Sequence, residues 1–149
     1  MLKLIFHSFP SGRAGIALVL IRFYVGIAFI QHGGGKLDDV AGFAAEYHLP
    51  WIVAAGTMVL QLTGGILLII GLLTPLAALG IAGTMIGATL TLIQKGEPFI
   101  NPAGHSWENS SFYFMLCVAL SLLGAGAYSL DARLFGRGKE KIVYDGITT

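Results

Sequence analysis

The feature that most constrains this chain is an apolar run that carries an arginine. Residues 14–33 form a run long enough to cross a bilayer, yet Arg22 lies near its middle. A charged side chain is costly in hydrocarbon and needs a partner that faces it from another helix. The sequence therefore predicts a bundle of membrane helices rather than one isolated span.

Three further apolar runs have the length of membrane spans. They cover about residues 51–73, 75–93 and 112–130, and the 149-residue chain is 55% hydrophobic and 11% charged. Soluble domains contain about 25% charged residues, whereas a span needs about 20 apolar ones. We therefore expect an all-α membrane protein, an antiparallel four-transmembrane-helix bundle that forms a single domain over residues 1–149.

The connections between the spans carry local signals. Apolar residues recur at helical spacing within residues 37–49, which predicts a short amphipathic helix in the membrane interface, with Asp38 or Asp39 as its N-cap. Thr74 and Pro75 separate the second span from the third. A connection this short predicts antiparallel neighbours, with Thr74 as the cap of the third span.

Glycines recur within the later spans, where they permit close approach of helix backbones. Gly83 and Gly87 form a Gly-x-x-x-Gly motif that packs either against a neighbouring helix of the chain or against a second copy. A homo-oligomer is therefore one of the open outcomes. We expect six glycines to serve helix packing: Gly64, Gly65, Gly83, Gly87, Gly124 and Gly126.

Lysine and arginine predict the orientation in the membrane. With four spans, both termini lie on one side, and the opposite loops hold only Lys36 and Lys95. Under the positive-inside rule, the termini are then cytoplasmic. The cations on the side of the termini are Lys3, Arg13, Arg133, Arg137, Lys139 and Lys141.

The depth of Arg22 narrows the choice of its partner. At about 1.5 Å per residue, both Arg22 and Gln61 lie near the midplane, whereas Asp131 lies at the inner end of the fourth span. A glutamine cannot neutralise a charge, so we expect Asp131 to be the ionic partner and Gln61, Tyr128 and Ser129 to be secondary acceptors. Arg22 then either fixes helix register or holds a polar head group, since a guanidinium donates to a quinone carbonyl.

A second group of polar residues maps to the outer surface. It includes His32, Lys36 and Glu108, and the glycines at 33–35 let the backbone approach a ligand. Each has a structural alternative: His32 as a hinge residue, Lys36 as a surface anchor and Glu108 as a partner of Lys36 or of a helix N-terminus. The other members of this group are Glu46, His105 and Trp107.

Several chemistries find no support in the sequence. The single cysteine, Cys117, excludes an intrachain disulfide and a Cys-x-x-Cys motif. We expect no haem, because only His32 is near a span, and no metal site or covalently bound cofactor. A net charge of +1 gives no reason to expect nucleic acid. Any redox chemistry must then come from a diffusible cofactor or a partner subunit.

Four motifs follow one another along the chain: Leu20-Ile21-Arg22, Gln31-His32-Gly33-x-x-Lys36-Leu37, Gln61-x-x-Gly64-Gly65 and Gly124-x-Gly126-x-Tyr128-Ser129-Leu130-Asp131. In this order and spacing they resemble the DoxX family of four-helix bacterial membrane proteins, some of which are subunits of thiosulfate:quinone oxidoreductase. The chain departs from the family where relatives often carry a glutamate, at Gln61, and where they often carry an arginine, at Thr74 to Leu76.

The resemblance implies a membrane subunit of a quinone-linked oxidoreductase in the bacterial inner membrane, acting on sulfur compounds or in oxidative stress. Its partners would be the lipid bilayer and other subunits, and its cofactor a quinone. A non-catalytic scaffold for a redox or respiratory complex is the alternative, and a small transporter is less favoured. The candidate ligand residues are Arg22, Gln61 and Asp131 in a polar pocket, and His32, Lys36 and Glu108 at its outer mouth, with no catalytic role assigned. The departure at Gln61 favours the outer group as the functional end and Arg22 as its buried support.

Overall fold

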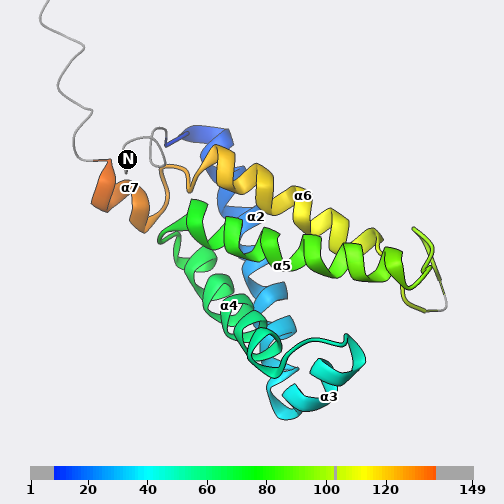
Figure 1. The fold of residues 1–149 in the computed structure, drawn as a ribbon. Helices are drawn as coiled ribbons and strands as arrows, with labels where there is room; N and C mark the ends of the chain where they lie inside the picture. The colour runs from blue at the N-terminus through cyan, green and yellow to red at the C-terminus, as the bar shows by residue number, and fades with distance from the viewer. Residues whose placement is uncertain (1–8, 103, 137–149) are drawn as a thin grey trace, which may run out of the picture.

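The computed structural model describes residues 9–102 and 104–136, and regular structure within these ranges is helical throughout. The predicted all-α class is confirmed. Cations at positions 3, 137, 139 and 141, which carry part of the orientation argument, lie outside the described residues. The structure has four long helices: α2 (Gly12–Gly34), α4 (Trp51–Ile70), α5 (Thr74–Gln94) and α6 (Glu108–Leu123) (Figure 1). The short η1 (Leu37–Asp39) and α3 (Val40–Glu46) lie between α2 and α4, and α7 (Leu130–Phe135) follows α6.

Three segments within the described ranges are long and apolar enough to cross a membrane: Gly12–Glu46, Trp51–Ile70 and Thr74–Gln94. Helix α6 is also apolar but has 16 residues. That is about 24 Å at the helical rise, less than the ~30 Å of the hydrocarbon core. The predicted end of the fourth span at residue 130 is wrong, because Gly124 takes φ 76° and ψ −168° and ends α6 at Leu123.

The long helices form two pairs, α2 with α4 and α5 with α6 (Figure 1). The backbones of α2 and α4 touch, since a Cβ on Gly26 would lie 2.7 Å from the carbonyl oxygen of Gly65. A Cβ on Gly33 would lie 2.8 Å from the carbonyl oxygen of Met58. Glycine at these positions therefore permits the close packing of the first pair. The buried core beside it includes Leu18, Val25, Phe29, Leu68, Ile81 and Leu120.

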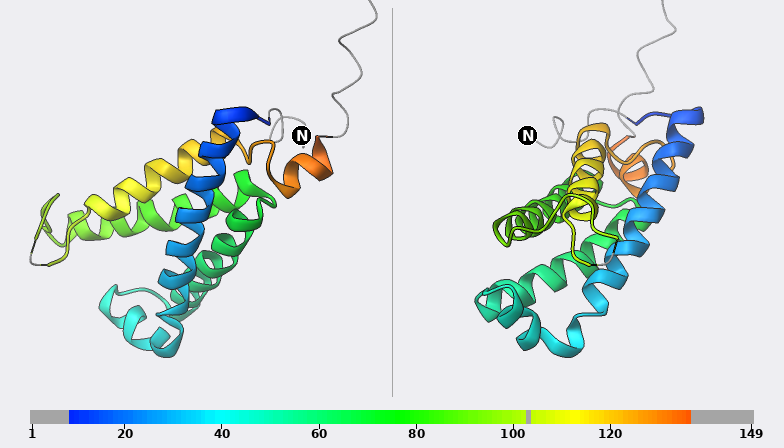
Figure 2. Two further views of the ribbon diagram at one scale, coloured as in Figure 1. Left: turned by 180° about the vertical axis from the view of Figure 1, so that it is seen from behind. Right: turned by 90° about the vertical axis from the view of Figure 1, so that its right-hand side faces the viewer.

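The two pairs are joined by a tight turn and diverge from it. Gly71 (φ 68°) ends α4, and Leu73 (φ 49°) precedes α5. Close to the turn, a Cβ on Gly64 would lie 3.0 Å from a side chain of α5. Farther out the helices separate (Figures 1 and 2), and a Cβ on Gly83 or Gly87 would have no other atom within 4 Å. The Gly-x-x-x-Gly motif of Gly83 and Gly87 therefore does not pack against a helix of the same chain, and that alternative of the prediction is wrong.

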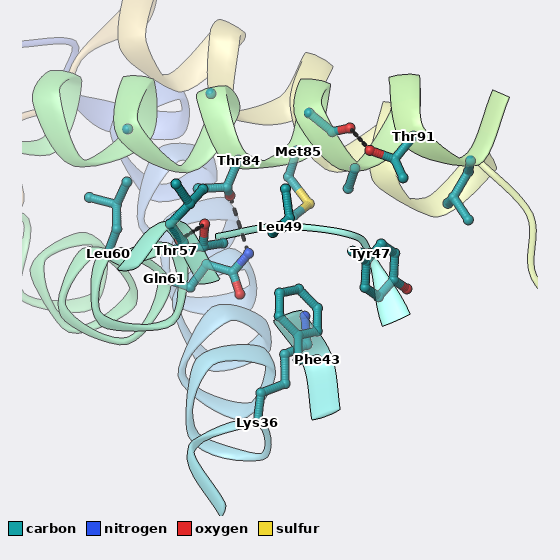
Figure 3. A pocket seen from close by; sticks show the side chains of 16 residues that line it. Lys36, Phe43, Tyr47, Leu49, Thr57, Leu60, Gln61, Thr84, Met85 and Thr91 are labelled. Atoms are coloured by element: carbon teal, nitrogen blue, oxygen red, sulfur yellow. Dashed lines mark hydrogen bonds between the residues drawn. The ribbon is translucent and has the colours of Figure 1, made fainter. Parts of the chain in front are cut away.

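Helix α3 lies at the far end of the diverging helices (Figure 1). We call this the outer end of the molecule and the end that carries α7 the inner end, following the predicted orientation. Asp39 caps α3, as one of the two predicted candidates, because its carboxylate accepts the backbone N–H of Gly42 at 2.7 Å. The rings of Phe43 and Tyr47 lie 4.8 Å apart and face the space between α4 and α5 (Figure 3).

Candidate functional site

Four residues at the inner end, Arg22, Gly71, Tyr128 and Asp131, form a group that we call the inner polar cluster. Arg22 is 2% exposed, and its Nη2 donates to the carbonyl oxygen of Tyr128 at 2.7 Å. Its Nε and Nη1 have no acceptor among the described residues. Gly71 makes room for the guanidinium, because a Cβ at this position would overlap Nη1.

Asp131 connects the end of the chain to the turn between α4 and α5. Its Oδ1 accepts the backbone N–H of Leu73 at 2.7 Å, and its Oδ2 accepts that of Thr74 at 2.8 Å. The backbone N–H of Asp131 in turn donates to the carbonyl oxygen of Gly71 at 2.8 Å. Asp131 therefore caps α5, whereas the Oγ1 of Thr74, the predicted cap, has no partner within the part of the chain that the structure describes.

The geometry of the inner polar cluster favours a structural role. Both carboxylate oxygens of Asp131 are occupied by backbone N–H groups, so this residue acts on Arg22 through its charge. The acceptor that contacts Arg22 directly is a backbone carbonyl, not the aspartate. Of the two predicted roles for Arg22, fixing the register of the helices fits this arrangement.

Because α4 and α5 diverge, a cleft of about 390 Å³ lies between them, and α3 borders it at the outer end (Figure 3). Its volume lies within the range of roughly 300–1,000 Å³ found for small-molecule sites. Most of its lining is apolar, which suits a ligand with an aromatic ring or an aliphatic tail. The polar side chains that line it are Lys36, Tyr47, Thr57, Gln61, Thr84 and Thr91.

Gln61 is the most deeply buried polar residue of the cleft, at 1% exposed. Its Nε2 donates to the Oγ1 of Thr84 on α5 at 3.2 Å (Figure 3). Its Oε1 has no partner in the described chain. An unpaired acceptor in a buried place is costly, so Gln61 is the residue of the cleft wall with unused hydrogen-bonding capacity.

Two lysines stand near the outer rim. The Nζ of Lys36, which lines the cleft, lies 4.6 Å from the ring centroid of Phe43. The Nζ of Lys95 lies 4.5 Å from the ring of Tyr47 and donates to the carbonyl oxygen of Glu46 at 3.1 Å. Partial burial raises the pKa of Tyr47, and the Glu46 carboxylate raises it further. The phenol therefore stays protonated at neutral pH and keeps its hydrogen as a donor.

The remaining predicted residues lie elsewhere. The ring of His32 lies 5.7 Å from that of Phe29 and 6.1 Å from that of Tyr113, a packing role at the end of α2. Glu108 lines a separate hollow with Phe112. The single pocket expected around Arg22, Gln61 and Asp131 is therefore corrected to two sites. Of the six candidate ligand residues, the cleft brings together two, Lys36 and Gln61.

Sequence reasoning missed the contribution of α5 to the cleft. Gly80, Gly83, Thr84 and Gly87 all line it. Their spacing of three and four residues places them on one helix face. Interpreting Gly83 and Gly87 only as packing residues hid that signal, because glycines that meet no neighbouring atom can border a cavity instead.

The fold and the cleft define the class: a helical membrane protein with a cleft between two of its spans. The chain belongs to the DoxX family, whose model matches residues 17–94. The matched range contains Arg22 and the whole lining of the cleft, whereas Tyr128 and Asp131 lie beyond it.

Two relatives cover most of the chain. One is a "Putative oxidoreductase CatD" of Bacillus subtilis, 31% identical over 128 residues, which make up 84% of this chain and 91% of the relative. The other is an "Uncharacterized protein" of Haemophilus influenzae, 32% identical over 124 residues, which make up 79% of this chain and 90% of the relative. No solved structure matches the chain significantly.

Proposed function

We propose that this protein is the membrane subunit of a quinone-linked oxidoreductase and that the cleft between α4 and α5 holds the quinone ring. The observation that carries the proposal is the cleft itself, an apolar space with a buried, incompletely hydrogen-bonded amide at Gln61. Small-molecule sites typically combine an apolar lining with a few placed polar groups.

The lining suits each part of a quinone. The rings of Phe43 and Tyr47 can pack against the planar head group. The ammonium of Lys36 can donate a hydrogen bond to a quinone carbonyl. Because the cleft lies between two helices long enough to span a membrane, an isoprenoid tail can remain among the lipids while the ring enters.

The oxidoreductase part of the proposal draws on the relative named as a putative oxidoreductase. In this proposal a partner subunit supplies the electrons, from a sulfur compound or in oxidative defence, and the protein lies in a bacterial inner membrane with cytoplasmic termini. The alternative is a non-catalytic scaffold that binds no ligand. Such a scaffold does not need an open cleft beside the buried amide of Gln61.

Quinone binding can be tested by filling the cleft. Gly83→Leu adds a side chain where a Cβ meets no atom within 4 Å, so it should occupy the cleft without disturbing the helices. The matched control is Gly56→Leu on α4, where a Cβ also meets nothing within 4 Å but which does not line the cleft.

The measurement is calorimetric titration of the full-length protein, in quinone-free nanodiscs, with a short-tailed benzoquinone. We expect saturable binding by the wild type and by Gly56→Leu, and a loss of more than about tenfold in affinity for Gly83→Leu, because one displaced ring contact is worth roughly 1.5 kcal/mol or more. Equal affinity of the two variants would place the quinone elsewhere and reject the cleft.

A further inference from the structure

We propose that a ligand reaches the cleft from the membrane, through the side between α4 and α5, and that α3 closes the outer end of the cleft against water by its contact with Lys95. The inference rests on the proposed function for the identity of the ligand, and it adds the source of that ligand, the bilayer rather than the aqueous phase. Two observations carry it: a row of side chains across the outer end, and exposed apolar residues along the side.

Four side chains at the outer end of the cleft form a row that we call the outer row: Lys36, Phe43, Tyr47 and Lys95. The Nζ of Lys36 lies 4.6 Å from the ring centroid of Phe43. The rings of Phe43 and Tyr47 lie 4.8 Å apart (Figure 3), and the ring of Tyr47 lies 4.5 Å from the Nζ of Lys95. Lys36 follows α2 and Lys95 follows α5, so the row extends across the outer end from the first helix pair to the second.

Lys95 joins α3 to the end of α5. Besides contacting the ring of Tyr47, its Nζ donates to the carbonyl oxygen of Glu46, the last residue of α3, at 3.1 Å. The last carbonyl groups of a helix lack intrahelical partners and carry partial negative charge, so an ammonium is favoured there. Within the described ranges no other hydrogen bond joins α3 to α5 or to its C-cap. Loss of the Lys95 ammonium should therefore free α3 from the second helix pair.

The side of the cleft differs from its outer end, because the lining residues there are exposed and apolar. Leu60 and Gly83 both line the cleft and lie near the middle of α4 and α5. Both are exposed, Leu60 by 40%. Since α4 and α5 are long and apolar enough to span a membrane, exposed surface at their middle faces hydrocarbon. A ligand dissolved in the bilayer therefore meets the cleft without crossing the outer row.

The threonines in the lining of the cleft give water few hydrogen bonds. The hydroxyls of Thr57, Thr84 and Thr91 donate to carbonyl oxygens of their own helices, at 2.9, 2.8 and 2.9 Å. A hydroxyl has one hydrogen to donate, so none is left for water. A quinone, which is itself dissolved in hydrocarbon, suits such a space, whereas a water-soluble substrate would have to pass the outer row.

The test measures how often a spin label in the cleft collides with two paramagnetic reagents, by electron paramagnetic resonance on the full-length protein in phosphatidylethanolamine nanodiscs. The label is attached to Gly87→Cys, a position that lines the cleft and where a Cβ meets no atom within 4 Å. Oxygen dissolves in hydrocarbon, whereas nickel ethylenediaminediacetate stays in water. Cys117 is buried, and the chain without an introduced cysteine reports any label that reaches it.

The matched control is Gly56→Cys on α4, which lies outside the cleft and has the same free space for a Cβ. At the helical rise, Gly56 lies about 8 Å from the outer end of α4 and Gly87 about 11 Å from the outer end of α5. Both labels should collide often with oxygen and rarely with nickel. His105→Cys, at an exposed position between α5 and α6, gives the level of nickel collisions in water.

Removal of the Lys95 ammonium should open the outer end. In Lys95→Met we expect nickel collisions at Gly87→Cys to increase about threefold, the scale of one lost cation–π contact at an exposed site, and those at Gly56→Cys to stay unchanged. Lys95→Arg keeps the charge and the hydrogen-bond donors, so the outer end should stay closed. Tyr47→Leu removes the ring that Lys95 contacts and should cause a smaller increase.

Three results overturn the inference. The first is a label at Gly87→Cys that collides with nickel as often as one at His105→Cys while Lys95 is in place. The second is a collision rate that Lys95→Met leaves unchanged, and the third is an equal increase at Gly56→Cys, which would show a general loosening of the helices. No quinone is used, so failure here leaves the quinone titration to decide on the proposed function, and failure of that titration leaves the route into the cleft standing.

Discussion

The inner polar cluster and the cleft use buried polar groups in opposite ways. At the inner end, Asp131 gives both carboxylate oxygens to backbone N–H groups, and Arg22 contacts a backbone carbonyl, while its Nε and Nη1 have no acceptor among the described residues but do not line the cleft. In the wall of the cleft, Gln61 holds one side-chain partner, Thr84, and its buried Oε1 has no partner among the described residues. The comparison teaches that a buried polar residue indicates a ligand only where its hydrogen bonds are left incomplete beside a cavity.

The largest expected effect is on the inner polar cluster. Asp131→Ala leaves the N–H groups of Leu73 and Thr74 without an acceptor and removes the negative charge near Arg22. We expect the free energy of unfolding to fall by about 3–5 kcal/mol, as when one partner of a buried charged pair is removed. Reversible unfolding in mixed micelles measures it, with the exposed Asp38→Ala as a control expected within about 0.5 kcal/mol of wild type.

Gly71→Ala should have the next largest effect. A methyl group here overlaps the Arg22 guanidinium and sits on a backbone with φ 68°, so we expect a loss of about 1–3 kcal/mol in the same unfolding assay. Gly56→Ala, where a Cβ meets no atom within 4 Å, is the control and should not destabilise. A Gly71→Ala protein as stable as the wild type would show that the turn does not confine Arg22.

A variant that fills the cleft should lose quinone binding without losing stability. Gly83→Leu is expected to remove quinone binding while changing the free energy of unfolding by no more than about 0.5 kcal/mol, because an added Cβ meets no atom within 4 Å and the position borders the cleft. Parallel binding and unfolding measurements on one preparation check this. A strong destabilisation would mean that α4 and α5 close on each other in the membrane, and the contrast with the inner end would fail.

A small effect on stability is also expected for Gln61→Leu. The substitution removes the bond to Thr84 and the unpaired oxygen together, so the two changes offset each other and the free energy of unfolding should stay within about 1 kcal/mol of wild type. Loss of quinone binding with retained stability would make Gln61 a ligand residue. A loss of more than ~3 kcal/mol would make it a structural one.

The sequence predicted those features of the fold that depend on residues close together in the chain. Apolar runs predicted the helical membrane class, and Asp38 and Asp39 were the two predicted candidates for the cap of the short helix, of which Asp39 caps α3. The end of α6 was missed, because Gly124 was interpreted as a packing glycine rather than as the residue that ends the helix. A glycine has no side chain to distinguish these roles, so only its backbone angles decide between them.

The candidate site was predicted only in part, because its residues come together through long-range contacts. Asp131 caps a helix that begins 57 residues earlier in the chain, and no spacing rule reveals such a cap. Gln61 and Lys36 were recognised as candidates, but their common cleft depends on how far α4 and α5 diverge. That divergence follows from the turn at Gly71 and Leu73, and helical periodicity contains no information about it.

The distance along the chain between Arg22 and the residues that contact it has a consequence for biosynthesis. Helix α2 leaves the ribosome long before Tyr128, which lies 106 residues later, so the arginine enters the membrane before its carbonyl partner exists. Until then the guanidinium depends on water or lipid phosphates. The last-made described segment thus secures the first helix, and a chain that stopped at the end of α6 would leave Arg22 without its acceptor.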